Sequence, residues 1–321
     1  MAKVTLTLAC AATDRSRPIL DGRVAIPGVE VIPLVGEPED IFARAMRDAP
    51  FEVTELSMGS HIVTTARGDA RYVGVPVFLS RAFRHSAITI RTDRGIAGPR
   101  DLEGRTIGLP QYQQTAALWV RGILRDHYGV DTRRIAWRTG AERTPIRLPP
   151  GHDVAPLPGG DLNAALAEGV LDGMASPRPP ACLAEGSAPV ARLWPDTMAE
   201  EVAWHRASGF FPIMHCLAVR RDVAEKHPWL PVELFRAFAK ARAMAVAELS
   251  LNNVLRVSLP WIAEAYRQQA AIMGGDPWPY GFARNRDEVA AMIRYAVEDG
   301  LAAAPIPPEA LFHPSTLGEQ P

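Results

Sequence analysis

Short extended segments alternate with helical segments through the first part of the chain, and this alternation restricts the fold more than any other feature. Residues 4–8 and 29–34 have the pattern of strands, residues 39–47 have that of a helix, and residues 51–57 form a third strand. Strands separated by helices favour a mostly parallel sheet with helices packed on its faces. The sequence therefore predicts an α/β fold.

The same rhythm continues further along the chain. A long helix is predicted over residues 112–128, with Gly129 at its C-terminal end, and Asp161 is the expected N-cap of a helix over residues 162–169. Residues 138–160 are rich in Pro, Gly and charged side chains and predict a surface excursion. The remaining predicted elements are strands at 73–78, 87–91, 106–110, 171–176 and 210–220 and helices at 58–68, 232–251, 254–271 and 286–299.

Length and charge limit the class of protein. A chain of 321 residues exceeds what one hydrophobic core usually fills, so two domains are expected. Hydrophobic residues make up 47% and charged residues 22%, and no segment approaches the roughly 20 apolar residues of a membrane span. The formal net charge of -1 offers no general attraction for nucleic acid or anionic lipid. We expect a soluble protein with neither as its partner, and the sequence leaves a homo-oligomer open.

Cysteine usage and the first residues bear on the compartment. Cys10, Cys182 and Cys216 are odd in number and widely spaced, which favours buried reduced thiols over disulfides or a zinc-thiolate site. Residues 1–10 carry one positive charge and an apolar run too short and too alternating for a signal peptide. We therefore expect a cytoplasmic location.

Residues 101–108, Asp-Leu-Glu-Gly-Arg-Thr-Ile-Gly, precede a helix whose first residues are polar. This segment resembles the D-L-x-G-K-x-V-G segment of type 2 periplasmic-binding folds. The resemblance implies an α/β fold of two lobes, with mostly parallel sheets flanked by helices and a ligand cleft between the lobes. It also implies that the chain crosses twice, so that residues 1–87 and 214–321 form one lobe and residues 88–213 the other.

A narrower resemblance appears when several segments are taken together. They are Glu55–Ser57 (ELS), Pro76–His85 (PVFLSRAFRH), Pro110–Ala116 (PQYQQTA), Trp119–Leu124 (WVRGIL) and Phe211–His215 (FPIMH). These segments resemble the 4,5-dihydroxyphthalate decarboxylase family, cytoplasmic proteins with the periplasmic-binding fold. The resemblance implies decarboxylation of a hydroxylated aromatic dicarboxylate, with no cofactor predicted.

Candidate substrate-binding residues lie near the expected crossings and at a helix start. Arg81 and Arg84 can each hold a carboxylate in bidentate geometry, and the alternative is that they pair with acidic residues at the hinge. Gln113 and Thr115 lie where free backbone N–H groups and the helix dipole favour an anion, although simple capping is the alternative. Further candidates are Arg178 on a proline-flanked loop, Phe83 and Tyr112 against the substrate ring, and Ser57, which is also an expected N-cap.

Three residues are candidates for acid and base chemistry. Glu55 ends a strand, and partial burial would raise its pKa and make it a usable general acid, whereas pairing with Arg81 or Arg84 is the alternative. His85 and His215 lie beside the expected crossings, and a satisfied core histidine is the alternative for each. Glu55, His85 and His215 together also suit one divalent metal, without supporting spacing.

The mechanism implied by the resemblance protonates the ring carbon that carries the carboxylate. His215 or Glu55 would deliver the proton, and His85 would polarise the phenol. The main alternative is a non-catalytic binding protein for a small carboxylate, which would share the fold and the arginines. An enzyme of unrelated chemistry on the same scaffold stays open, because a fold does not fix a function.

Overall fold

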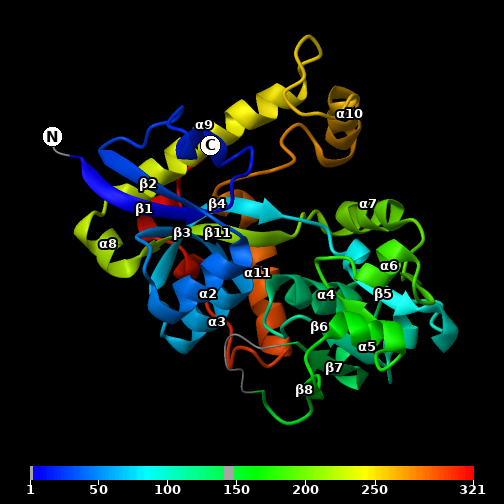
Figure 1. Cartoon of the computed structure of the whole chain (residues 1–321). Helices are drawn as coiled ribbons and strands as arrows, with labels where there is room; N and C mark the ends of the chain where they lie inside the picture. The colour runs from blue at the N-terminus through cyan, green and yellow to red at the C-terminus, as the bar shows by residue number, and fades with distance from the viewer. Residues whose placement is uncertain (1–2, 141–147) are drawn as a thin grey trace. The chain divides into compact units, whose positions relative to one another are not determined.

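The computed structural model describes residues 3–140 and 148–321, and it divides into two compact units (Figure 1). Unit 1 comprises Met1–Arg81, Ile213–Ala290 and Ile306–Pro321, and unit 2 comprises Ala82–Pro212 and Ala291–Pro305. The chain thus leaves unit 1 at Arg81 instead of residue 87 and returns at Ile213. Residues 291–305, which the sequence placed in the first lobe, belong to unit 2.

The sheet of unit 1 has five strands in the order β2-β1-β3-β11-β4. Strand β1 pairs in parallel with β2 and β3, while β11 is antiparallel to both β3 and β4, so β11 alone runs against the other four. A mostly parallel sheet was predicted and is confirmed. The strands are β1 (Val4–Cys10), β2 (Val29–Val35), β3 (Val53–Ser57), β4 (Tyr72–Arg81) and β11 (Ile213–Arg220).

The sheet of unit 2 has six strands in the order β10-β5-β9-β6-β7-β8. Strand β5 is antiparallel to β9 and β10, and β6 is parallel to β7 and β9. In both sheets the reversed strand is the first one formed after the chain crosses between units. The strands are β5 (Ile88–Arg91), β6 (Thr106–Leu109), β7 (Ala136–Thr139), β8 (Val154–Pro156), β9 (Gly173–Ala175) and β10 (Val190–Arg192).

The predicted surface excursion over residues 138–160 is wrong in part. The end of β7 and all of β8 lie in it, and β8 occupies the end of the sheet, where Pro156 removes no hydrogen bond from a central ladder. Proline and glycine on both sides of this short edge strand concealed its pattern in the sequence. Residues 141–147 of the excursion lie outside the described part of the chain.

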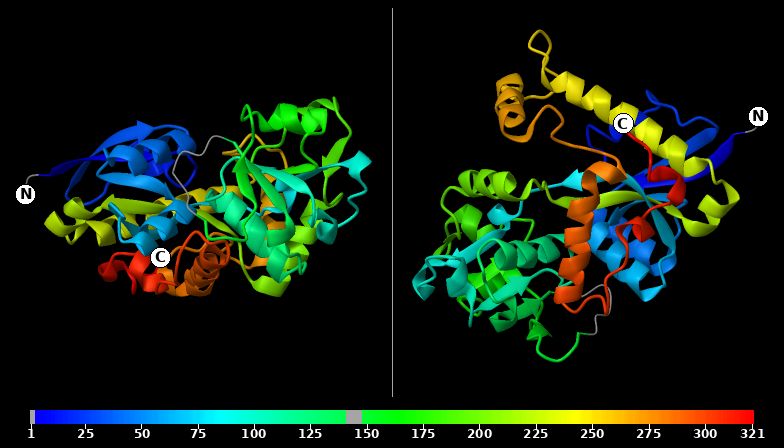
Figure 2. Two further views of the ribbon diagram at one scale, coloured as in Figure 1. Left: turned by 90° about the horizontal axis from the view of Figure 1, so that it is seen from below. Right: turned by 180° about the vertical axis from the view of Figure 1, so that it is seen from behind.

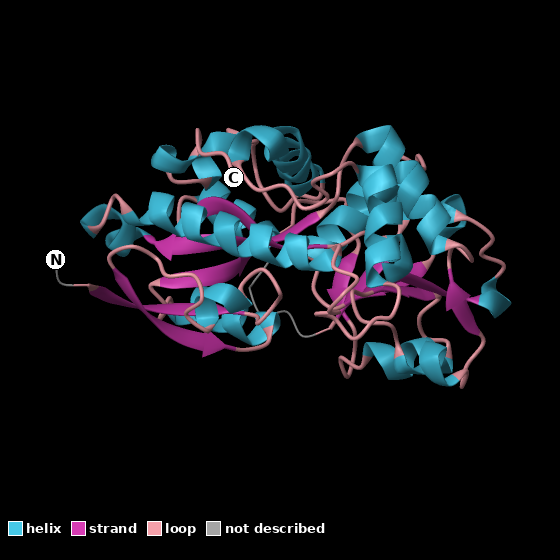
Figure 3. Ribbon diagram, turned by 90° about the horizontal axis from the view of Figure 1, so that it is seen from above, coloured by secondary structure: helices cyan, strands magenta, loops and turns pink. Residues whose placement is uncertain are grey.

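Helices flank the strands of each unit (Figure 3). Ser57 caps α3 by accepting a hydrogen bond from Ser60 N at 3.4 Å, and Gly68 ends the helix in the left-handed conformation that favours glycine. The helices of unit 1 are α1 (Arg17–Leu20), α2 (Pro38–Asp48), α3 (Met58–Arg67), α8 (Arg221–Lys226), α9 (Leu230–Leu249) and α10 (Ile262–Met273), with the first part of α11 (Phe282–Glu298).

One predicted helix of unit 1 begins later than expected. Residues 254–271 were predicted to be helical, but α10 begins only at Ile262. Pro260 explains the difference, because proline disfavours the helical conformation at the residue before it. Figure 1 and the right-hand view of Figure 2 show the chain between α9 and α10 extending beyond the C-terminal end of α9.

The sequence predicted two of the first four helices of unit 2, α4 and α5, but not α6 or α7. Asp161 caps α5 by accepting hydrogen bonds from Asn163 N and Ala164 N, both at 3.0 Å, as predicted. The long helix α4 begins at Thr115 instead of residue 112. These helices are α4 (Thr115–Asp126), α5 (Leu162–Glu168), α6 (Ala181–Glu185) and α7 (Thr197–Ser208), with the last part of α11.

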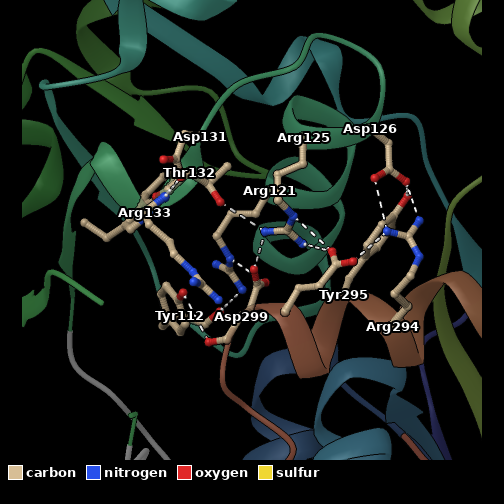
Figure 4. A network of polar contacts seen from close by, with 12 residues as sticks. Tyr112, Arg121, Arg125, Asp126, Asp131, Thr132, Arg133, Arg294, Tyr295 and Asp299 are labelled. Atoms are coloured by element: carbon tan, nitrogen blue, oxygen red, sulfur yellow. Dashed lines mark hydrogen bonds and ion pairs between the residues drawn. The ribbon is translucent and has the colours of Figure 1, made fainter. Parts of the chain in front are cut away.

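An ion-pair network that is buried around Asp299 attaches the second segment of unit 2 to α4 (Figure 4). Asp299 Oδ2 lies 2.6 Å from Arg121 Nε, and its Oδ1 lies 2.5 Å from Arg125 Nη1. Arg294 also pairs with Asp126 at 2.5 Å. These contacts explain why residues 291–305 belong to unit 2. Among the described residues, no helix is long and apolar enough to cross a membrane.

Candidate active site

Polar side chains lie close together where the parallel strands of unit 1 end. We call this side of the sheet, formed by the carboxyl ends of the strands, its carboxyl edge. Glu55 and Ser57 lie near the end of β3, and Ala11 directly follows β1. Because β11 runs in the opposite direction, its beginning, with His215, lies at this same edge. Ligand sites of open α/β sheets lie at the carboxyl ends of the strands, so this edge is the candidate site.

A carboxylate and an imidazole meet there. His215 pairs with Ser57 and Leu217 pairs with Glu55 in the register of β11 and β3, which sets the His215 and Glu55 side chains diagonally across the two strands. His215 Nδ1 lies 2.6 Å from Glu55 Oε1, and Ala11 N donates to Glu55 Oε2 at 2.9 Å. Both carboxylate oxygens are therefore fixed by hydrogen bonds.

An irregular strand pairing surrounds His215. The register between β11 and β4 shifts on both sides of His215, between Ile213 and His215 and between His215 and Leu217. Such bulges bend a strand and redirect its side chains, and they often occur beside active sites. The ring of Phe42 contacts the imidazole edge to face, with centroids 4.7 Å apart. The backbone and this ring together set the orientation of the imidazole.

Burial does not make Glu55 a general acid, contrary to the sequence prediction. Its side chain is 3% exposed, and burial by itself raises the pKa of the carboxyl. The hydrogen bond and charge of His215, the bond from Ala11 N and the charge of Arg15 outweigh burial and leave the Glu55 pKa below its usual value. Glu55 is thus an ionised partner of His215.

The pair can exchange protons through the second imidazole nitrogen. Glu55 occupies Nδ1, and among the described residues Nε2 of His215 has no hydrogen-bonding partner. The His215 side chain is 18% exposed, so it remains accessible while Glu55 is enclosed. A carboxylate on one nitrogen fixes the tautomer and orientation of the ring and stabilises its charged form.

Arg81 is held inside unit 1 by its own chain. Its side chain is 0% exposed, Nη1 lies 3.2 Å from Glu288 Oε2, and Nη2 donates to Pro279 O at 3.0 Å and to Asn285. Glu288 also accepts a hydrogen bond from Ile213 N at 2.6 Å. The geometry therefore favours the structural alternative over substrate binding. Glu288 joins the two strand ends where the chain leaves and re-enters unit 1.

Sequence reasoning missed Arg15, which follows β1 at the same sheet edge. Its guanidinium lies 3.9 Å from the centroid of Trp278, and Nη2 donates to Leu79 O at 2.9 Å. Arg15 also pairs with Asp14, whose carboxylate lies 2.6 Å from Nη1. The position of Arg15 in the loop that follows β1 was the signal that could have identified it.

His85 is enclosed in unit 2 by aromatic rings. Trp194, Trp204 and Tyr128 lie around it, with ring centroids 5.0, 5.9 and 5.9 Å away. Both ring nitrogens are buried without a hydrogen-bond partner among the described residues, and burial lowers the His85 pKa to about 4. The ring is therefore neutral at pH 7, and this packing favours the core alternative over a direct role on the phenol.

The neighbours of His85 also have partners inside unit 2. Phe83 packs on Phe211, with ring centroids 4.7 Å apart, and is half-buried. Burial lowers the pKa of Arg84 to about 10, and the charge of Glu201 opposes this shift. Tyr112 is buried under Arg121, and its hydroxyl donates to Asp299 O at 3.4 Å, so its ring is not available to stack on a substrate.

The start of α4 keeps the features expected of an anion site. Its N-cap, Gln114, makes no side-chain capping bond, so Thr115 begins a helix whose first N–H groups are not capped by that side chain. Gln113 is buried, and its Oε1 has no partner among the described residues. Arg178 is exposed on the loop after β9, where its backbone N donates to Ser176 Oγ at 3.2 Å.

The metal alternative finds no ready ligand set among the residues that the structure describes in either unit. Glu55 and His215 are a single pair in unit 1, and His85 is enclosed in unit 2. Among the described residues, no group of three or more His, Cys, Asp or Glu side chains is arranged to hold a metal ion.

Solved structures identify the fold. The periplasmic aliphatic sulphonate binding protein SsuA from Escherichia coli is similar over 99% of this chain and 100% of its own, with a TM-score of 0.57 and 14% identity. The alkanesulfonate-binding protein SsuA from Xanthomonas axonopodis pv. citri, bound to MOPS, is similar over 97% of this chain and 98% of its own, with a TM-score of 0.55 and 14% identity. The predicted periplasmic-binding fold is thereby confirmed.

Sequence relatives identify the family, although no family model matches the chain. A 4,5-dihydroxyphthalate decarboxylase from Pseudomonas putida is 40% identical over 218 residues, which cover 65% of this chain and 84% of the relative. Another, from Comamonas testosteroni, is 41% identical over 325 residues, which cover 99% of this chain and 98% of the relative. Their similarity confirms the resemblance seen in the sequence motifs, and the chain belongs to the 4,5-dihydroxyphthalate decarboxylase family.

Proposed function

We propose that this chain is a carboxy-lyase that removes one carboxyl group from a hydroxylated aromatic dicarboxylate such as 4,5-dihydroxyphthalate. The observation that carries the proposal is the Glu55–His215 pair at the carboxyl edge of a sheet, 2.6 Å from nitrogen to oxygen. Its support is the 41% identity, over 99% of the chain, to a protein named for this activity.

The substrate itself makes the reaction feasible. A hydroxyl group para to a carboxylate can lose its proton, and the electron pair then increases the electron density at the ring carbon that bears the carboxylate. That carbon takes a proton and forms a new C–H bond. The C–C bond to the carboxylate breaks, its electron pair returns to the ring, and carbon dioxide leaves. The phenolate oxygen then takes back a proton from water, so the sum of these steps consumes one proton and converts 4,5-dihydroxyphthalate to 3,4-dihydroxybenzoate and carbon dioxide.

His215 is the proposed proton donor. The imidazolium donates from Nε2 to the ring carbon, while Glu55 stays ionised on Nδ1 and stabilises the positive charge. The neutral imidazole left after this transfer takes its next proton from water. Glu55 is therefore a positioning residue, and His215 takes the role of proton donor, which the sequence left open between the two residues.

Each unit, taken by itself, offers candidate anchors for a carboxylate. In unit 1 Arg15 is held at the site edge by Leu79 O and Trp278, and Ser57 pairs with His215 across the strands. In unit 2 the start of α4, with Gln113 and Thr115, suits a carboxylate. Arg178 and Arg84 are further cations in that unit.

The cytoplasm is the proposed compartment. Cys10, Cys182 and Cys216 all lie in the described part of the chain, where each is buried and outside any disulfide. Burial raises the pKa of Cys10 and of Cys216 to about 12, which keeps these thiols protonated and unreactive. Reduced thiols are typical of a cytoplasmic protein. Fractionation of the native host followed by immunoblotting tests this placement.

A turnover assay tests the function. The purified protein should convert 4,5-dihydroxyphthalate to 3,4-dihydroxybenzoate, followed by liquid chromatography and by release of carbon dioxide. Phthalate, which lacks the para hydroxyl, should bind without turnover. The substitution His215→Ala should lower kcat by roughly 10²-fold or more. His227→Ala, which alters the C-cap of α8 beyond the other end of β11, is the matched control and should keep full activity.

A binding protein for a small carboxylate is the second candidate. The observation that favours it is the likeness of the whole fold to sulphonate-binding proteins. The two candidates differ in the fate of the ligand. Binding of 4,5-dihydroxyphthalate with no product after prolonged incubation would favour the binding protein and reject the decarboxylase.

A further inference from the structure

The buried carboxylate of Glu288 holds two strand ends of unit 1 at once. Its Oε1 accepts a hydrogen bond from Ile213 N at 2.6 Å, and its Oε2 lies 3.2 Å from Arg81 Nη1. Ile213 is the first residue of β11 and Arg81 is the last residue of β4, and the two are partners in the register of these strands. Glu288 therefore fixes the point at which β11 begins.

The strand pairing explains why a side chain accepts the hydrogen bond from Ile213 N. Ala82 N donates to Pro212 O at 3.0 Å, so Arg81 and Ile213 form a non-hydrogen-bonded pair of the antiparallel ladder. In such a pair the N–H groups of both residues point away from the partner strand. The N–H group of Ile213 is thus directed away from β4, towards the side of β11 on which β3 lies.

Strand β3 is too short to receive this N–H group. It ends at Ser57, which is the partner of His215, and α3 begins at the next residue. Ile213 lies two residues before His215 and therefore beyond the end of β3. Glu288 supplies the acceptor that a longer β3 would have supplied.

The backbone around His215 depends on this anchor. The pair of His215 with Ser57 is the last one between β11 and β3, and the register between β11 and β4 shifts on both sides of His215. The ends of paired strands open more readily than their centres. The hydrogen bond to Glu288 holds the chain on the side of His215 where β3 has ended.

Glu288 is itself held in place by a polar network. Arg81 also donates to Pro279 O at 3.0 Å and to Asn285. Asn285 lies one helical turn before Glu288 on α11 and donates to Gly281 O at 2.7 Å. Hydrogen bonds that involve charged groups are stronger than neutral ones, and a network of them in a buried position holds its members in one geometry.

We propose that Glu288 is a positioning residue for the reaction, because its hydrogen bond to Ile213 N keeps His215 in place against Glu55. The inference rests on the proposed decarboxylase function and adds a residue that acts through the backbone of β11. A misplacement of about 1 Å can lower a rate by roughly 10²-fold. Loss of this hydrogen bond should lower kcat and leave KM nearly unchanged, since it displaces the proposed proton donor and not the candidate carboxylate anchors.

Two substitutions of similar size test the hydrogen bond. Glu288→Met and Glu288→Gln both remove the charge opposite Arg81 and keep an unbranched side chain, but only glutamine keeps an oxygen that can accept from Ile213 N. Glu288→Met should lower kcat by about 10-fold to 10²-fold, and Glu288→Gln should recover most of that loss. Equal kcat values for the two variants would overturn the inference.

A double variant separates positioning from stability. Arg81→Met with Glu288→Met replaces the buried ion pair by apolar side chains, a change that is often neutral or stabilising. It should raise the midpoint of urea denaturation above that of Glu288→Met, while kcat stays as low as in that variant. Recovery of kcat together with stability would mean that Glu288 only stabilises the fold.

The hydrogen bond between His215 and Glu55 provides a measurement that needs no turnover. A proton on Nδ1 in a short bond to a carboxylate resonates far downfield in an NMR spectrum, and isotopically labelled histidine identifies it. This resonance should appear in the wild type and in Glu288→Gln and should move or disappear in Glu288→Met. An unchanged resonance in Glu288→Met would overturn the inference. If the resonance depends on Glu288 in this way but the wild type releases no carbon dioxide, the positioning role stands and the proposed decarboxylase function is rejected.

Discussion

His215 and Glu55 are separated by 160 positions in the sequence, and their side chains meet at 2.6 Å between Nδ1 and Oε1. They meet because β11, the first strand after the chain returns to unit 1, inserts between β3 and β4 and runs against both. The second crossing of the chain thus completes the pair. The carboxylate belongs to the first segment of unit 1, and the imidazole arrives with the second.

Removing either member of this pair should reduce activity, and the two losses should not add. Glu55→Gln leaves the shape of the side chain but removes the charge that orients and stabilises the imidazolium, so kcat should fall by about 10-fold to 10³-fold. The double variant Glu55→Gln with His215→Ala should be no more than a few-fold slower than His215→Ala. Steady-state kinetics of the three variants measure this. Independent, multiplying losses would show that Glu55 acts on the substrate directly.

The Glu55 carboxylate should also make the fold sensitive to acid. The pKa of Glu55 is lowered in the folded state, so its contribution to the free energy of unfolding is complete above the unfolded value near 4.5. The contribution is lost as pH falls through the folded value. Urea denaturation from about pH 6 to pH 3 should show a steeper loss for the wild type than for Glu55→Gln. Equal slopes would mean that Glu55 does not titrate with folding.

The alternation of apolar and polar residues, together with residues typical of helix ends, predicted most of the fold. Alternation located β1, β2 and β3, a glycine and an aspartate marked helix ends at Gly68 and Asp161, and the family motifs indicated the two crossings. The failures have local causes. Strand β8 is three residues long and ends in proline, so it has no alternation to detect. The start of α10 was predicted too early because Pro260 interrupts an otherwise helical pattern.

The roles of several candidate residues depend on contacts with residues far away in the sequence, which the sequence could not predict. Arg81 and Glu288 are 207 positions apart, and no local sequence pattern predicts that they pair. Tyr112 is a second example. Its hydroxyl bonds to Asp299 O and its ring is covered by the Arg121 guanidinium. Arg15 was missed because an arginine in a polar loop resembles an ordinary surface residue until the strand end beside it is known.

The Arg81–Glu288 pair should be structural, so that its loss reduces stability more than ligand affinity. Arg81→Ala leaves the buried Glu288 carboxylate, 7% exposed, without its cation and should lower the free energy of unfolding by about 3 to 5 kcal/mol. Chemical denaturation measures this change. The control is Arg286→Ala, which removes an exposed pair with Glu309 from α11, the helix of Glu288, and should change stability little. A stable Arg81→Ala protein that no longer binds substrate would restore the substrate-binding role.

Asp299 should contribute to the stability of unit 2 as the Arg81–Glu288 pair contributes to that of unit 1. Asp299→Ala removes the carboxylate that Arg121 and Arg125 share and leaves the fully buried Arg121 guanidinium without its ion pair, at a loss of about 3 to 5 kcal/mol. Its neighbour offers the control, because Glu298 is 35% exposed and Glu298→Ala should cost about 1 kcal/mol or less. Hydrogen exchange should show the loss of protection in α4 for Asp299→Ala. Unchanged exchange there would mean that residues 291–305 are attached by other contacts.

Replacing His85 by phenylalanine should separate a packing role from a catalytic one. Phenylalanine keeps an aromatic ring among Trp194, Trp204 and Tyr128 and removes two buried nitrogens that have no hydrogen-bond partner among the described residues, so stability at pH 7 should be unchanged or higher.

The acid response of His85→Phe gives the quantitative test. The His85 pKa is about 4 in the folded state and 6.5 in an unfolded chain, so the wild type keeps this contribution above pH 6.5 and loses it as pH falls to about 4. The loss is at most roughly 3 kcal/mol, and His85→Phe should lack it in urea denaturation across this range. Turnover should persist at pH 7. A variant that is stable but inactive would mean that the imidazole leaves its aromatic enclosure to act on the substrate.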